Sequence, residues 1–81
     1  MTDYRTAEPL EADGLEDALI GVGWQFSQAL MVYSVKKVLE ILMTRDGMSH
    51  EEAREFYEFN IVGAYVGPGT PVFVEDEDMY E

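Results

Sequence analysis

The fold is decided by residues 29–53, which read ALMVYSVKKVLEILMTRDGMSHEEA. Five apolar residues come first, and Ser34 follows them as a residue type that favours the N-cap of a helix. Apolar residues then recur at the i, i+3, i+4, i+7 spacing of one helix face, at Val35, Val38, Leu39 and Leu42. Gly47 comes just after this pattern, where glycine commonly ends a helix. The pattern predicts an extended run followed by a helix over residues 35–46.

A second helix begins after Ser49 in the same stretch. Ser49 and Glu52 have the spacing of a capping box, in which each side chain binds a free backbone N–H of the first turn. Gly67 and Pro68 end the pattern, because proline cannot continue a helix. The sequence predicts a helix over residues 50–66, with one face formed by Ala53, Phe56, Tyr57, Asn60, Ile61, Ala64 and Tyr65.

The residues before the first helix predict a β-hairpin. An apolar run over residues 18–23 leads into Trp24, Gln25 and Phe26, and the polar pair Ser27-Gln28 then separates it from the run over residues 29–33. A single helix through both runs is the alternative, and Gly21 and Gly23 disfavour it. Residues 72–74 form another apolar run, which predicts a short third strand. The expected fold class is therefore α+β, with a short hairpin, two helices, a C-terminal strand and acidic ends.

Charge divides the chain into three parts. The 81 residues carry a formal charge of −12, with residues 1–17 and 75–81 rich in acids and the middle close to neutral. We expect an acidic arm over residues 1–16, one small domain over residues 17–74 and an acidic tail over residues 75–81. The apolar fraction of 47% is too high for a disordered chain, so the middle is expected to fold.

Composition also excludes several classes of function. The chain has no cysteine and no apolar stretch long enough for a bilayer, which favours a cytoplasmic protein. Its acidity argues against direct binding of nucleic acid or anionic membranes, since both need a basic face. His50 is the single histidine, so no other histidine could serve as the catalytic base of a serine or cysteine hydrolase. The acidic runs lack the spacing of a calcium loop. We therefore expect a protein that is not an enzyme and has no cofactor or metal.

Two sets of residues are candidates for contact with a partner protein. The first is acidic and consists of a ridge on the second helix and the start of the tail, Glu51, Glu55, Glu58, Glu75, Asp76, Glu77 and Asp78. Carboxylates one helical turn apart have a separation similar to that of phosphates along a nucleic-acid strand. A solvated helix face is the plainer interpretation of the ridge.

The second set is mainly aromatic and could contact a partner or a second copy of the chain. It comprises Trp24, Phe26, Phe56, Asn60 and Tyr65. Asn60 interrupts an apolar helix face, which predicts either a buried amide with its hydrogen bonds satisfied or a contact that sets register across a dimer interface. The buried amide is the favoured interpretation.

The block from Asp17 to Val74 resembles a family of short uncharacterised proteins of phages, prophages and bacteria. The similarity lies in ALIGVG at residues 18–23, VYS at 32–34, GMS and EEA at 47–49 and 51–53, FNIVGAYVG at 59–67 and TPVF at 70–73. The resemblance implies a phage or mobile-element setting. It implies no catalytic or binding residue.

Size, charge and setting together predict a small acidic protein-binding module. In a phage this would be an inhibitor of a host defence or nucleic-acid-binding protein, similar in size and charge to anti-CRISPR proteins that imitate DNA with carboxylates. The partner would present a basic surface. The alternative is a homo-oligomeric structural or accessory phage domain, with a homodimer as its simplest form, in which the acids serve only solubility.

Overall fold

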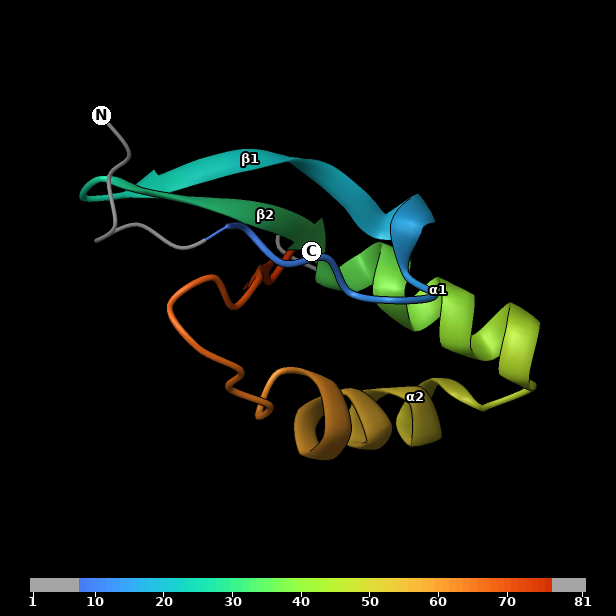
Figure 1. The fold of residues 1–81 in the computed structure, drawn as a ribbon. Coiled ribbons are helices and arrows are strands. Elements are labelled where there is room, and N and C mark those ends of the chain that lie inside the picture. The colour runs from blue at the N-terminus through green and yellow to red at the C-terminus, as the bar shows by residue number, and fades with distance from the viewer. Residues whose placement is uncertain (1–7, 77–81) are drawn as a thin grey trace.

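A computed structural model describes residues 8–76 and has the predicted α+β architecture (Figure 1). The strands are β1 (Leu19–Gln25), β2 (Gln28–Ser34) and β3 (Val72–Val74). The helices are α1 (Val35–Asp46) and α2 (His50–Phe56), with a 3-10 turn η1 (Glu16–Ala18) before β1 and a π-helical turn η2 (Tyr57–Ile61) after α2.

The three strands form one mixed sheet in the order β1-β2-β3. β1 and β2 are antiparallel and are joined by the two-residue turn Phe26-Ser27, which confirms the predicted hairpin. β3 confirms the predicted third strand and lies parallel to β2, with Val72 opposite Val32. In Figure 1 the far end of the hairpin extends away from both helices. The turn is therefore the part of the sheet most remote from α1 and α2.

Helix α1 has the predicted bounds and the predicted caps. The Ser34 side chain accepts a hydrogen bond from the Lys37 backbone N–H at 3.1 Å. Gly47 ends the helix with a φ of 72°, in the left-handed region where glycine carries no steric penalty. The local sequence signals alone therefore account for both ends of this helix.

Helix α2 begins as predicted but is shorter. The capping box is present, with the Glu52 backbone N–H bonded to Ser49 Oγ and the Ser49 N–H bonded to Glu52 Oε1. The predicted end at residue 66 is wrong, because α-helix stops at Phe56, η2 stops at Ile61 and residues 62–71 form turns and irregular chain. Side chains after Ile61 are mostly exposed, so no apolar burial supports further helical turns.

The core lies where α1, α2 and the near end of the sheet meet. Its buried members are Leu15, Ala18, Tyr33, Val35, Val38, Leu39, Leu42, Ala53 and Tyr57. The ring of Phe73 on β3 packs against Tyr33 and Tyr57, with centroids 5.6 and 5.7 Å away. β2 and β3 are thereby joined to η2 through three aromatic side chains.

The described part of the predicted acidic arm, residues 8–16, packs against this domain. The Ala12 backbone N–H donates to Tyr33 Oη at 2.8 Å, and the Leu10 N–H donates to the Gly69 carbonyl at 3.0 Å. A Cβ atom at Gly69 would lie 2.3 Å from the Glu8 carbonyl oxygen. Residue 69 must therefore be glycine for the two segments to lie this close.

Candidate partner-binding surface

The two strands of the hairpin differ sharply in burial. Six of the seven residues of β1 are exposed, whereas every residue of β2 is buried or half-buried. The large apolar side chains exposed on β1 and the turn are Leu19, Ile20, Val22, Trp24 and Phe26, and we call the last four the hairpin patch. Trp24 is 71% exposed and Phe26 is 98% exposed. Isolated surface apolar residues are ordinary, but a group that includes two aromatic rings is typical of an interaction site.

Phe26 is unusual in its backbone as well as in its exposure. Its φ is 56°, and it is the only non-glycine residue with positive φ among residues 8–76. An L-residue with a Cβ atom in this region costs about 1–2 kcal/mol. Burial of the ring does not offset that cost, because the side chain is almost fully exposed. Folding of the chain thus gives no reason for phenylalanine here, and contact with another molecule would give one.

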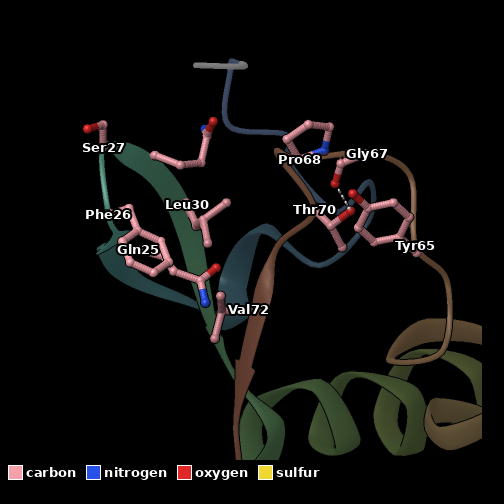
Figure 2. Close-up of a pocket in the computed structure, with 10 residues that line it drawn as sticks. Gln25, Phe26, Ser27, Leu30, Tyr65, Gly67, Pro68, Thr70 and Val72 are labelled. Carbon is pink, nitrogen blue, oxygen red and sulfur yellow. Dashed lines mark hydrogen bonds between the residues drawn. The ribbon is translucent and has the colours of Figure 1, made fainter. Parts of the chain in front are cut away.

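Beside the turn lies a hollow of about 670 Å³. Figure 2 shows Gln25, Phe26, Leu30 and Val72 on the hairpin and β3 side, with Tyr65, Pro68 and Thr70 on the loop opposite. The hollow is wide open and mixes polar with apolar groups. Its form suits a side chain that projects from a macromolecule better than an enclosed small ligand.

The loop that forms the far side of this hollow is held by Thr70. Its hydroxyl donates to the Gly67 carbonyl at 2.5 Å and accepts from the Val66 backbone N–H at 3.0 Å. Tyr65 is 77% exposed beside it. The loop is therefore ordered by its own hydrogen bonds, while its aromatic side chain stays available for contact.

The structure divides the predicted aromatic set between two places. Phe26 and Tyr65 line the same hollow, and Trp24 lies on β1 two residues before Phe26. Phe56 and Asn60 line a separate hollow beside α2. Asn60 is exposed and its Nδ2 donates to the Phe56 carbonyl at 3.3 Å, so the prediction of a buried amide is wrong. Its role in a dimer interface stays a prediction.

The acidic set is also divided, because Arg54 neutralises part of it. Its Nε donates to Glu58 at 3.0 Å, and both terminal nitrogens donate to Glu75 at 2.9 Å. Glu51 and Glu55 are exposed on α2 and line a shallow hollow with Glu58. Glu51 and Glu55 are therefore the better placed members of the ridge for contact with a basic partner.

The Arg54 cluster also changes the titration of its members. The hydrogen bonds with Glu75 raise the pKa of Arg54 above its already high ordinary value. Burial, with a further contribution from the Glu75 charge, raises the pKa of Tyr57 to about 12. The Arg54 guanidinium lies 5.5 Å from the centre of the Tyr57 ring, within cation–π range. This cluster connects η2 to the residue that follows β3, which is a structural role.

The Asp76 carboxylate is hydrogen-bonded to groups at the start of α1. It accepts hydrogen bonds from Ser34 Oγ at 2.5 Å and from the Lys36 backbone N–H at 2.9 Å. Burial opposes its ionisation, but these hydrogen bonds outweigh it and lower the pKa of Asp76. Glu77 and Asp78, the remaining predicted acids, lie outside the described residues. Of the tail residues that the structure describes, both Glu75 and Asp76 thus bind groups of their own chain.

Within residues 8–76, no three histidine or acidic side chains are grouped so that they could hold a metal ion. The same residues contain no helix with the length and apolar character of a membrane span. Comparisons with protein-family models, with curated proteins and with solved structures find no match.

Sequence reasoning missed two members of the hairpin patch, Ile20 and Val22. The signal was present, since Val22 and Trp24 alternate with Gly21 and Gly23 at the period of a strand. An apolar residue in such a pattern indicates the core as readily as a surface. The folded structure shows that both side chains stay exposed, with Ile20 at 49% and Val22 at 55%.

Proposed function

We propose that this protein is a non-enzymatic binding module that recognises a partner protein through the hairpin patch. The observation that carries the proposal is the pair of exposed aromatic side chains, Trp24 and Phe26, at the end of the sheet remote from the core. Aromatic residues supply much of the binding energy at protein interfaces. Phe26 supports the proposal further, because its backbone conformation is costly and the folded chain does not use its ring.

The charge of the chain supports a partner with a basic surface. A formal charge of −12 speeds encounter with such a surface and discourages association with acidic proteins. In the phage setting that the resemblance implies, the partner would be a nucleic-acid-binding or defence protein of the host. The module would inhibit it by covering the surface that normally receives phosphates. In this mechanism the hairpin patch supplies contact area, and Glu51 and Glu55 supply steering and charge competition.

The test compares changes at two exposed apolar sites, one in the hairpin patch and one on η2. The chain would be used as bait in host extract, and any basic protein recovered would be purified and titrated by calorimetry. We expect the double variant Trp24→Ser/Phe26→Ser to lose about 2 kcal/mol or more of binding free energy. Val62→Ser is the control, because Val62 is 46% exposed at the end of η2 and belongs neither to the hairpin patch nor to the acidic ridge. Equal losses from both variants would contradict the proposal.

The rates of association and dissociation, measured for the same complex at two salt concentrations, separate steering from contact. Higher ionic strength should slow association and leave dissociation nearly unchanged, as should Glu51→Gln/Glu55→Gln. Sedimentation of the isolated chain addresses the alternative of a homo-oligomer. A dimer that dissociates when Trp24 and Phe26 are replaced would assign the patch to self-association and overturn the proposal.

A further inference from the structure

Strand β1 leaves one full edge of the sheet uncovered by the described part of the chain. The strand order places β2 on one side of β1 and no strand on the other. Its seven residues, LIGVGWQ, include no charged residue and no proline. Proteins usually protect such an edge with lysine, proline, a bulge or a covering segment, because unpaired backbone groups accept a further strand. The single irregularity of β1 is a register shift between Leu19 and Gly21, so residues 21–25 pair regularly.

The opposite edge of the same sheet is built differently. β3 has three residues, and it is followed at once by Glu75 and Asp76. A short strand that ends in charged residues is a poor template for a further strand. Such protection is therefore present at β3, whereas residues 21–25 of β1 show none of these devices.

The pairing of the hairpin shows which backbone groups of β1 point outward. Gln25 and Gln28 close the two-residue turn and form the hydrogen-bonded pair nearest to it. Such pairs alternate with pairs that lack mutual hydrogen bonds, so the next positions of the second kind are Trp24 and Val22. The N–H and C=O groups of these two residues face away from β2. They are also the residues whose exposed side chains share one face of the strand.

We infer that β1 receives an extended segment of the partner as a fourth strand of the sheet. This inference rests on the proposed function and specifies its mode of recognition. Backbone hydrogen bonds at Val22 and Trp24 would supply affinity, and the side chains of the hairpin patch would supply selectivity. The added strand would continue the sheet on the side where β1 is exposed.

Charge at one end of β1 specifies the chemistry of this segment. Glu16 and Asp17 lie exposed immediately before the strand, whereas the end at Phe26 and Ser27 carries no charge. A complementary segment has alternating apolar residues along β1 and lysine or arginine where it passes Leu19. A second copy of this chain fits less well, because each copy carries a formal charge of −12 and the two copies repel one another.

The test uses a displayed library of random peptides as the probe and the intact chain as the target. We expect enriched peptides to alternate apolar residues and to end in basic residues. Val22→Pro removes an N–H that points away from β2, a position that proline tolerates on edge strands. It should weaken the binding of enriched peptides about tenfold or more. Val22→Ala keeps the N–H and should weaken binding less, which separates backbone pairing from side-chain contact.

A second measurement leaves the protein unchanged, so it does not depend on folding of the proline variant. Synthetic versions of an enriched peptide would be N-methylated at alternate residues, in two complementary sets. Methylation on the edge that faces β1 should abolish binding, and methylation on the other edge should preserve it. Equal effects from the two sets would overturn the inference, as would enrichment of peptides without apolar alternation.

Failure of this inference is distinguishable from failure of the proposed function. A natural partner that is lost on Trp24→Ser/Phe26→Ser but retained on Val22→Pro overturns strand addition and leaves the proposed function intact. A partner insensitive to both changes overturns both. Sedimentation of the chain as a dimer that Val22→Pro dissociates would show that a second copy occupies the edge, which also overturns the inference.

Discussion

The two ends of the hairpin differ in burial and in their effect on folding. Near α1, Tyr33 is 1% exposed and contributes its ring and its hydroxyl to the domain. At the turn, Phe26 is 98% exposed and adopts a backbone conformation that opposes folding. The same strands thus supply stability at one end and an unused apolar surface at the other. The comparison implies that mutations should separate stability from binding according to their place along the hairpin.

The largest effect is expected from Leu39→Ala, on α1 in the core cluster that also contains Tyr33. Leu39 is 1% exposed and belongs to the core cluster. Loss of its side chain should lower the free energy of unfolding by about 2–5 kcal/mol, which is a large part of the stability of so small a domain. Urea denaturation followed by circular dichroism measures the change. Val22→Ala, at an exposed position of β1, is the control, and a loss of similar size there would break the comparison.

The next effect concerns the contact between residues 8–10 and the loop after η2. Gly69→Ala would place a Cβ atom 2.3 Å from the Glu8 carbonyl oxygen and should destabilise the fold by about 1–3 kcal/mol. Hydrogen exchange at the Leu10 amide, which donates to Gly69, should accelerate. Gly21→Ala is the matched control on β1, because a Cβ atom there meets open space. Unchanged exchange at Leu10 in the Gly69 variant would refute this account of residue 69.

A smaller effect with the opposite sign is expected at the turn. Phe26→Asn should raise the free energy of unfolding by about 0.5–1 kcal/mol, since asparagine tolerates positive φ better than phenylalanine. The same change should weaken partner binding, because the ring is lost. Thermal unfolding checks the first part, with Ser27→Asn as a control in the same turn. Destabilisation by Phe26→Asn would indicate that the folded chain does use the ring.

The smallest effect depends on pH and concerns Asp76. Because its pKa is lowered on folding, its contribution to stability is complete above the ordinary carboxyl pKa of about 3.9 and is lost as pH falls through the folded value. The native chain should therefore lose more stability on acidification below about pH 4 than Asp76→Asn does. Denaturation over a pH series measures the difference. Glu11→Gln, at an exposed carboxylate, should follow the native chain.

Local signals predicted those parts of the fold that local interactions determine. Ser34, Ser49 and Gly47 set helix ends within a few residues of themselves, and the structure confirms each. The end of the second helix was mispredicted because Gly67 and Pro68 only limit a helix, whereas burial of its side chains sustains it. Past Ile61 that burial is missing. Tertiary packing therefore determines where the second helix ends, which the local sequence does not.

The candidate surface was predictable only in part, for a similar reason. The sequence identifies Trp24, Phe26 and Tyr65 as aromatic candidates. Their arrangement depends on which strand lies at the sheet edge and on how the loop after η2 packs beside the hairpin. The engagement of Glu58 and Glu75 by Arg54 depends on contacts between distant segments. A charge pattern in sequence cannot distinguish a carboxylate that faces solvent from one that its own chain neutralises.

The parallel pairing of β3 with β2 has a consequence for the order of folding. Ser34 pairs with Val74 and bonds the Asp76 side chain 42 positions away, and both helices lie between these residues. Closing so long a loop costs more chain entropy than forming the adjacent hairpin strands. We expect the hairpin and α1 to form early, and the arrival of β3 to complete the domain. The Arg54–Glu75 ion pair would then form in this last step and slow the reopening of the finished fold.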